Sequence, residues 1–268
     1  MIHPTAIVDP RAEIDASAEV GPYVVIEGPV RVGPRTRLMP HVVLMGDTHL
    51  GADNVLHPGV VLGDTPQDLA YRDTPSGVRI GDRNIFREFS QVHRGTQPDT
   101  VTVLGDDNFL MINAHVAHNC RIGSRVIIAG GALVAGHVVV DDDAFISGNC
   151  VVHQHVRIGR LSIMRGLSRT SRDVPPFALV DGTHTVRGVN RVGLRRAGFD
   201  RARTRAMVEA FRVLFSERRN LKVAMAEIDS APVTPDVQEL LAFIRASRRG
   251  AARGALRDAA DDAEDADE

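Results

Sequence analysis

Two histidines, His115 and His118, lie three residues apart in the stretch Asn113–Cys120. Imidazole titrates near neutral pH, and it is the side chain that most often takes a proton from a hydroxyl group in catalysis. The pair therefore indicates a candidate site for general acid–base chemistry. Two alternatives stay open at this point, namely exposed turn residues and part of a metal site, for which this spacing alone is weak evidence.

An apolar residue recurs at every sixth position through much of the chain, which is a period that neither an α-helix nor a simple strand has. The in-phase residues run from Ile2 to Leu62, from Ile80 to Val92 and from Leu104 to Met164, and all are aliphatic or aromatic. Hexapeptide repeats are typical of parallel β-helices, in which three hexads form one coil of about 18 residues. The sequence therefore predicts a mainly β prism of stacked coils over residues 1–190.

Two segments lose the six-residue phase and predict loops that leave the prism, at 63–79 and 96–102. Loops on a rigid scaffold commonly carry binding groups. Asp173–Pro176 is expected to end the coil, because consecutive prolines cannot continue a paired ladder.

A C-terminal helical domain is expected over residues 191–249. Apolar stripes predict helices at 200–218 and 221–228, and Thr234-Pro235 predicts the start of a third, with threonine as the N-cap. Residues 250–268 are mostly Ala, Arg, Asp and Glu, which predicts a disordered acidic tail.

The 18-residue coil also predicts which residues share an edge of the prism. His118, Gly136 and Gln154 fall in one column, and His137 lies one coil from Asn119. Histidines gather close to this edge over about three coils: His115, His118, His137 and His153.

A second column consists only of glycine, at Gly130, Gly148 and Gly166. A strip without side chains could form a groove for an extended alkyl chain. Glycine could equally serve the geometry of the corner, and periodicity does not separate the two interpretations.

Composition excludes several classes of protein. The net charge of −2 gives no reason to expect a nucleic-acid partner, and no stretch approaches the ~20 apolar residues of a membrane span. The N-terminus has no signal-peptide pattern, and Cys120 and Cys150 are expected to be reduced, so a cytoplasmic location is predicted.

The stretch Met111–Cys120 resembles the UDP-N-acetylglucosamine O-acyltransferases of the hexapeptide acyltransferase family. Further similar stretches are Pro66–Leu69, Ile80–Asn84, His93–Thr96, Ala135–His137, Val152–Gln154, Asp173–Pro176 and Gly188–Asn190. The resemblance covers residues 1 to about 245. It implies a left-handed coil, against the usual right-handed crossover rule.

The resemblance implies transfer of an (R)-3-hydroxyacyl group from acyl carrier protein to the 3-hydroxyl of UDP-N-acetylglucosamine, the first step of lipid A synthesis. It implies a homotrimer with sites between prisms, and no metal or cofactor apart from the acyl-phosphopantetheine that the carrier protein supplies. His118 matches the general base, and the backbone N–H of Gly136 matches the donor to the oxyanion.

Other positions acquire roles from the same resemblance. Those expected to bind substrate are Gln67, Asp68, His93, His115, His137, His153, Gln154, Asn190 and Arg196. Gly166 matches the position that sets acyl-chain length, where glycine implies a long chain. A basic patch for the acidic carrier protein is expected at Arg160, Arg165, Arg169 and Arg172.

Four residues depart from the family pattern. Asn119 stands where an aspartate is usual, and an amide can orient an imidazole but cannot stabilise imidazolium by charge. Ala70, Val192 and Ala197 replace a lysine, a glutamate and a basic residue, and all three changes weaken nucleotide recognition. An acyltransferase with a different nucleotide-sugar acceptor is therefore the first alternative, and a zinc-binding trimer like the carbonic anhydrases of this fold is the second.

Overall fold

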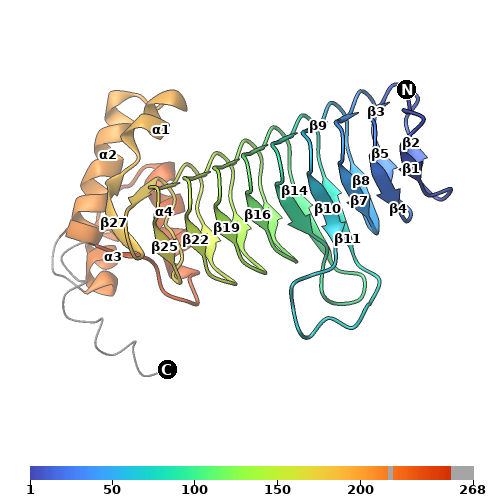
Figure 1. Cartoon of the computed structure of the whole chain (residues 1–268). Coiled ribbons are helices and arrows are strands. Elements are labelled where there is room, and N and C mark those ends of the chain that lie inside the picture. Colours follow the sequence, from blue (N-terminus) through green and yellow to red (C-terminus); the bar gives the residue numbers. More distant parts are fainter. Residues whose placement is uncertain (217–219, 255–268) are drawn as a thin grey trace.

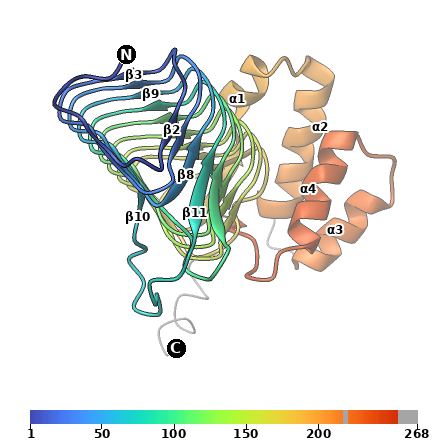
Figure 2. The ribbon, with the colours of Figure 1, turned by 90° about the vertical axis from the view of Figure 1, so that its right-hand side faces the viewer.

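A computed structural model describes residues 1–216 and 220–254, and most of them form a tall three-sided prism (Figures 1 and 2). The first sheet contains β1 (Ile7–Val8), β4 (Val25–Glu27), β7 (Val43–Met45), β10 (Val61–Asp64), β13 (Gln91–His93), β16 (His115–Val116), β19 (Leu133–Val134), β22 (Val151–Val152) and β25 (Arg169–Thr170). The second contains β2 (Glu13–Ile14), β5 (Arg31–Val32), β8 (Asp47–Leu50), β11 (Gly77–Ile80), β14 (Val101–Leu104), β17 (Arg121–Ile122), β20 (Val139–Val140) and β23 (Arg157–Ile158). The third contains β3 (Glu19–Val20), β6 (Arg37–Leu38), β9 (Val55–Leu56), β12 (Ile85–Phe86), β15 (Phe109–Leu110), β18 (Ile127–Ile128), β21 (Phe145–Ile146), β24 (Ile163–Met164), β26 (Ala178–Val180), β27 (Thr185–Val189) and β28 (Arg253–Gly254).

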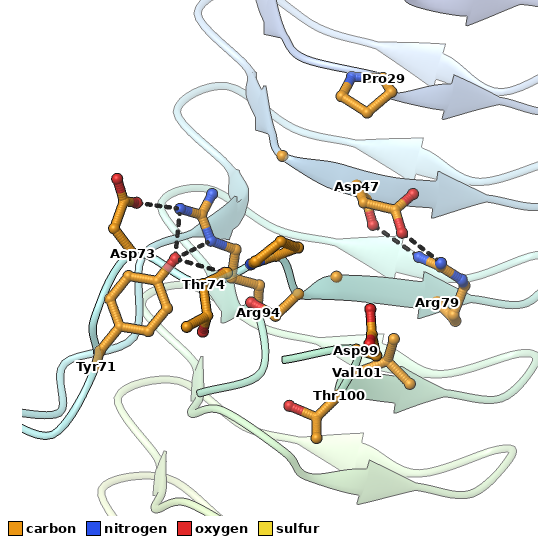
Figure 3. Close-up of a pocket in the computed structure, with 14 residues that line it drawn as sticks. Pro29, Asp47, Tyr71, Asp73, Thr74, Arg79, Arg94, Asp99, Thr100 and Val101 are labelled. Atoms are coloured by element: carbon orange, nitrogen blue, oxygen red, sulfur yellow. Dashed lines mark hydrogen bonds and ion pairs between the residues drawn. The ribbon is translucent and has the colours of Figure 1, made fainter. Parts of the chain in front are cut away.

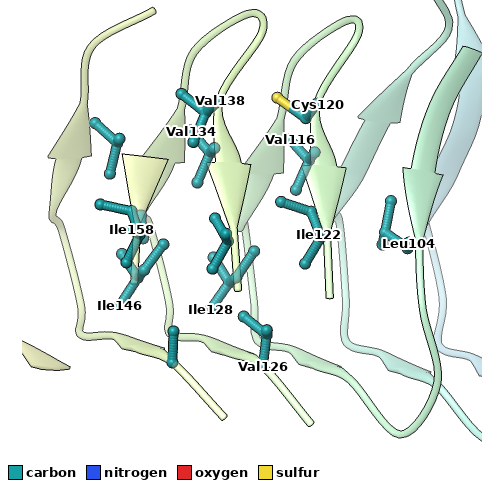
Figure 4. Close-up of a cluster of buried hydrophobic side chains, with 14 of the residues drawn as sticks. Leu104, Val116, Cys120, Ile122, Val126, Ile128, Val134, Val138, Ile146 and Ile158 are labelled. Atoms are coloured by element: carbon teal, nitrogen blue, oxygen red, sulfur yellow. The ribbon is translucent and has the colours of Figure 1, made fainter. Parts of the chain in front are cut away.

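The apolar hexads form the core of the prism, as the period predicted. Each coil pairs in parallel with the next, so that Val116 lies opposite Val134 and Val134 opposite Val152. The in-phase residues from Val20 onward are buried, and Figure 4 shows several of those between Leu104 and Ile158 pointing inward from all three sheets. Short strands rich in valine and isoleucine suit this interior because branched side chains pack well on a pleated surface.

The corners of the prism repeat one backbone conformation. A residue with φ near +60° recurs at six-residue intervals, for example at Asn113, Asn119, Arg125, Gly131 and His137. Asn, Asp and His tolerate this left-handed region better than most residues, and they are frequent here. At most corners the chain therefore turns from one sheet to the next with a residue other than glycine in the left-handed conformation.

Both loops leave the prism where the phase lapses, but the first is narrower than predicted and the second begins and ends two residues earlier than predicted. The first connects β10 to β11 through residues 65–76, and the second connects β13 to β14 through 94–100. Residues 77–79 and 101–102 belong to strands instead, because Val78 and Thr102 point into the core and are fully buried. The register jumps from Leu62 to Val92 across the first loop, thirty positions instead of the usual eighteen.

The coil continues past Pro175 and Pro176, contrary to the prediction that it ends there. Strand β26 still pairs in parallel with β24, and the direction reverses first at β27, with which β28 pairs in parallel. The prolines are tolerated because they occupy a corner between Val174 and β26, where the ladder does not require their missing N–H groups.

Helices pack at the end of the prism opposite the N-terminus (Figure 1). They are α1 (Arg191–Arg196), α2 (Arg201–Phe211), the π-helical turn η1 (Arg212–Ser216), α3 (Leu221–Asp229) and α4 (Pro235–Arg245). Thr234 caps α4 through its side-chain oxygen, with Pro235 at the first helical position, as the sequence predicted. The short helix α1 was not predicted. No described helix is long and apolar enough to cross a membrane.

The segment after α4 returns to the prism. Gly250–Gly254 were predicted to belong to a disordered tail, and this is wrong, because Arg253 and Gly254 form β28 beside β27. The backbone N–H of Ala252 also donates to the carbonyl of Asp173 at 2.7 Å. The remainder of the predicted tail, 255–268, lies outside the described residues.

Phe86 offers a test of the inward register. Its side chain is fully buried, whereas that of Ile85, the next residue along β12, is 40% exposed on the outer face. Phe86→Ala should lower the free energy of unfolding by about 3–5 kcal/mol, because it leaves a large cavity. Urea unfolding monitored by circular dichroism measures this, with Ile85→Ala as the matched control. Equal shifts of the midpoint for the two variants would contradict the register.

Candidate active site

The candidate site is a hollow of about 600 Å³ on the outer face of the first sheet. It extends to the corner between the first and second sheets, where the column His118, Gly136 and Gln154 lies. The lining residues are Gln67, Phe89, Gln91, Asn113, His115, Ala117, His118, Leu133, Ala135, Gly136, Val151, Val152 and Gln154. The column predicted from the 18-residue coil is therefore present, since His137 N–H donates to His118 O and His155 N–H to Gly136 O.

His118 is held in one orientation by the residue that follows it. Its Nδ1 lies 3.0 Å from Oδ1 of Asn119, which also accepts hydrogen bonds from the N–H and the hydroxyl of Thr96 at 3.0 Å each. A backbone N–H can only donate, so this atom is the amide oxygen and Nδ1 of His118 must carry the proton. The Nε2 lone pair is then free to accept a proton from a substrate.

Gly136 lies directly against this imidazole. A Cβ atom added at Gly136 would lie 2.5 Å from Nε2 of His118 and still closer to its Cε1, so any side chain would displace the ring. Among the described residues, none accepts a hydrogen bond from the Gly136 N–H. The position before the residue of positive φ generally does not use its N–H in the ladder, and at the other two corners of the prism it is occupied by Pro22, Pro34, Pro40 or Pro58. Gly136 therefore combines a spare N–H donor with open access beside the base.

Three imidazoles around His118 remain neutral at pH 7. Burial, followed by the neighbouring His93 and His118, lowers the pKa of His115 to about 4. Burial also lowers the pKa of His93, and that of His137 falls through burial and the nearby His155. The rings pack edge to face, at 4.9 Å between His93 and His115 and 5.2 Å between His118 and His137. These neutral rings can donate or accept hydrogen bonds without repelling a charge on His118.

The first loop brings Asp68 to the site. Its Oδ2 lies 3.7 Å from Nε2 of His118, too far for a hydrogen bond. Gln67 lines the hollow from the same loop. Both residues were predicted to bind substrate, and the loop places them opposite the column.

A second hollow, of about 550 Å³, lies at the base of this loop, and side chains that line it hold the loop in place (Figure 3). There Nη2 of Arg94 donates to the hydroxyl of Tyr71 at 2.9 Å, and Arg79 pairs with Asp47 at 2.5 Å on the second sheet. Arg94 thus ties the loop that carries Asp68 to the prism, because it also donates to the carbonyl of Gly63, whereas Arg79 and Asp47 pair within the second sheet.

The remaining predicted substrate-binding residues lie further from His118 along the chain. Gln154 lines the hollow and His153 is exposed beside it. Asn190 caps α1 by accepting from Gly193 N–H at 2.9 Å and donates to Leu161 O at 2.8 Å, so its side chain is engaged within the chain. Arg196 is exposed on α1. Substrate contacts of all four stay predictions.

The glycine column occupies a different corner, between the third and first sheets. A Cβ at Gly148 would lie 3.3 Å from Gly130 O, and one at Gly166 would lie 3.5 Å from Gly148 O. Neither glycine has a positive φ, so the corner does not require glycine for its backbone conformation. The groove for an alkyl chain and the role of Gly166 in chain length both stay predictions.

The four arginines of the predicted carrier-protein patch have different surroundings. Arg160 pairs with Glu239 of α4 at 2.8 Å and stacks on Phe177, so its guanidinium joins the prism to the helices. Arg165 pairs with Asp181 at 3.0 Å, and Arg169 donates to Thr183 at 3.0 Å. Arg172 is half-buried near Gly250. Their contact with a carrier protein stays a prediction.

Several residues of the site were not predicted. His155 stacks on His137 at 4.6 Å, and the 18-residue spacing between them was a signal that could have identified it. Leu133 and Val151, each 46% exposed, give the floor of the hollow an apolar character, and their outward places in the hexads indicate it. Thr96 orients Asn119 from a loop, and no periodicity points to it.

His115 should make the protein sensitive to acid. Its folded pKa of about 4 lies below the ordinary value of 6.5, so the unfolded chain binds a proton first. The stabilisation from the neutral ring is complete above pH 6.5 and is lost as the pH falls from 6.5 towards 4. His115→Gln should therefore lose less stability than wild type between pH 7.5 and 5, measured by urea unfolding. His41→Gln, at an exposed corner, is the control, and an unchanged acid sensitivity of His115→Gln would contradict this account.

Within the described part of the chain, no three His, Cys, Asp or Glu side chains are arranged to hold a metal ion. Cys120 is buried, and burial raises the pKa of its thiol to about 12. Neither observation supports the zinc alternative or a cysteine nucleophile.

Residues 102–136 match the family model for bacterial transferase hexapeptide (six repeats). Together with an oriented imidazole and an unused backbone N–H at one edge, this coil is that of a hexapeptide-repeat acyltransferase. Residues 173–252 match the model for UDP-N-acetylglucosamine O-acyltransferase, domain 2. An acyl-[acyl-carrier-protein]–UDP-N-acetylglucosamine O-acyltransferase of Paraburkholderia xenovorans is 45% identical over 256 residues, 93% of this chain and 98% of that protein.

The solved UDP-N-acetylglucosamine acyltransferase of Francisella novicida superposes with a TM-score of 0.91 at 34% identity, covering 95% of each chain. A relative from Thermodesulfovibrio yellowstonii, with the same name as that of Paraburkholderia, is 41% identical over 93% of this chain and 98% of its own. The chain belongs to the UDP-N-acetylglucosamine O-acyltransferase family, and its coil is the left-handed β-helix that the resemblance implied.

Proposed function

We propose that this protein transfers an (R)-3-hydroxyacyl group from acyl carrier protein to the 3-hydroxyl of UDP-N-acetylglucosamine, the first step of lipid A biosynthesis. The observation that carries the proposal is the pair formed by His118 and Gly136, in which a free Nε2 lies beside an unused backbone N–H. That pair suits attack of a hydroxyl on a thioester, because the reaction needs a base at the nucleophile and a donor at the carbonyl oxygen.

In the proposed mechanism, Nε2 of His118 takes the proton of the sugar 3-hydroxyl while that oxygen bonds to the thioester carbonyl carbon. The carbonyl oxygen becomes an oxyanion and accepts the hydrogen bond of Gly136 N–H. The tetrahedral intermediate then collapses, the carbon–sulfur bond breaks, and the imidazolium returns its proton to the thiolate of the carrier. Asn119 keeps Nδ1 protonated throughout. The reaction as written requires neither a metal nor a cofactor besides the acyl donor.

A homotrimer with the site between prisms is part of the proposal. The hollow lies on an open sheet face, and Leu133 and Val151 on that face remain 46% exposed in one chain. An adjacent prism would cover these apolar side chains and enclose the hollow, which is how a shallow site can bind an alkyl chain. We further propose a cytoplasmic location, where acyl carrier protein and nucleotide sugars occur.

Incubation with UDP-N-acetylglucosamine and (R)-3-hydroxyacyl carrier proteins of several chain lengths tests the function. Mass spectrometry should detect a product heavier than the nucleotide sugar by one hydroxyacyl group, together with free carrier thiol. Other nucleotide sugars should be offered in parallel, because Ala70 and Val192 are exposed and remove side chains expected to hold the nucleotide. Acylation of another sugar nucleotide in place of UDP-N-acetylglucosamine would contradict the proposed acceptor.

A further inference from the structure

The segment that follows α4 returns to the corner that carries the catalytic column. Asp173 N–H donates to Gly250 O at 3.0 Å, and Ala252 N–H donates to Asp173 O at 2.7 Å. These two backbone bonds hold the segment against the corner between the first and second sheets. His118, Gly136 and Gln154 lie at this same corner in preceding coils.

Arg249 of this segment spans two coils of the corner. Its Nε donates to the carbonyl of Ser171 at 3.1 Å, and its Nη2 lies 3.3 Å from Nδ1 of His153. Residues 153 and 171 are one coil apart, so the guanidinium lies along the axis of the prism. Its side chain is exposed, and the contacts with Ser171 and His153 fix where its charge lies.

The contact with Arg249 also fixes the proton of His153. A guanidinium has only donors, so Nδ1 of His153 must accept, and the neutral ring then carries its proton on Nε2. The approach of the same Nδ1 to Gln154 O, at 3.3 Å, is not a hydrogen bond in this state, because both atoms are acceptors. Arg249 and His153 therefore present a permanent positive charge and an N–H donor at one place, beside Gln154.

We propose that Arg249 binds the diphosphate of the nucleotide-sugar acceptor and positions His153 for the same task. The inference rests on the proposed function. A guanidinium and an imidazole N–H are suited to phosphate oxygens. Coils are stacked at about 4.8 Å, so the guanidinium between the coils of Gln154 and Ser171 lies roughly one to two spacings from Gly136. In the acceptor, one pyranose ring separates the reacting 3-hydroxyl from the first phosphate, which fits this short distance. The phosphate of the acyl carrier lies at the far end of the extended pantetheine arm, which does not.

Binding of UDP and of uridine to the full-length protein tests the proposal by calorimetry. Arg249→Gln should weaken UDP binding about tenfold and leave uridine binding unchanged, because only UDP carries the charge that the guanidinium binds. Arg249→Lys should recover part of the loss, since it keeps a charge without the planar fork. The neighbouring exposed Arg248→Gln is the matched control and should bind UDP as wild type does. In steady-state assays, Arg249→Gln should raise KM for the nucleotide sugar with KM for the acyl donor unchanged.

Two results would overturn the proposal. An equal weakening of UDP and uridine, not recovered in Arg249→Lys, would mean that Arg249 only supports the fold of the segment. If Arg249→Gln instead raised KM for acyl carrier protein and left UDP binding intact, Arg249 would bind the phosphate of the acyl donor. Failure of the proposed function is distinguishable from both, because wild type would then form no acylated nucleotide sugar.

Discussion

His118→Ala is expected to lower kcat by roughly 10²- to 10⁴-fold, the usual contribution of a positioned general base. His118 is 8% exposed and lines the hollow, and Asn119 holds its Nδ1, which leaves Nε2 for the substrate. Removing the ring removes the proton acceptor and, with it, the acid that protonates the leaving thiol. KM for the nucleotide sugar should change far less, because the other polar groups of the hollow remain. Initial rates with saturating acyl carrier protein and acceptor measure the effect.

His49→Ala is the matched control for this experiment. His49 is a half-buried histidine on β8 of the second sheet, paired with Asp47 and outside the hollow that His118 lines. Its variant should retain the wild-type kcat. A His118→Ala protein that is folded and acylates as fast as wild type would show that another group is the base.

Gly136→Ala is expected to lower kcat about a hundredfold or more, the size of effect seen when one oxyanion donor is lost. The added methyl group would lie 2.5 Å from Nε2 of His118. The imidazole must therefore move, or the methyl group must occupy the place of the carbonyl oxygen. Gly136 has no positive φ, so alanine is compatible with the backbone, and the protein should remain folded. Thermal unfolding and initial rates, measured on the same preparation, separate the two effects.

Gly148→Ala provides the comparison, since a Cβ there meets only the carbonyl oxygen of Gly130, at 3.3 Å. It lies at the corner between the third and first sheets and does not touch the histidines. The two alanine variants should have similar thermal stability and very different kcat with a short-chain donor. Wild-type turnover in Gly136→Ala would remove this glycine from the mechanism.

The fold was predictable from the sequence because the apolar residue at every sixth position indicates which side chains face inward. From Val20 onward the in-phase residues are buried, so the period gave the register of almost every strand. The column of His118, Gly136 and Gln154 followed from the same 18-residue spacing. Loop bounds were less predictable, because Val78 and Thr102 turn inward within segments that otherwise lack the pattern.

Contacts between distant segments could not be predicted from periodicity. Thr96 contacts Asn119 from a loop, and Arg249 contacts His153 although the two are 96 positions apart in the sequence. Neither contact follows from a repeat, because the paths of loops and helices depend on packing that has no period. Asn190 shows the same limit, since its cap on α1 became visible only when the helix was placed.

Because coils of equal length stack in register, the number of residues between His118 and Gly136 determines whether the two lie side by side. His118 and Gly136 lie side by side because they are eighteen positions apart, so an insertion or deletion of a single residue between them would rotate one group away from the other. The 65–76 loop already lengthens its coil by a large insertion, and the strands on either side keep their parallel pairing apart from one irregularity between Leu62 and Asp64. We therefore expect natural length variation in this family to concentrate in that loop, and the interval from 118 to 136 to keep its length even where its residues change.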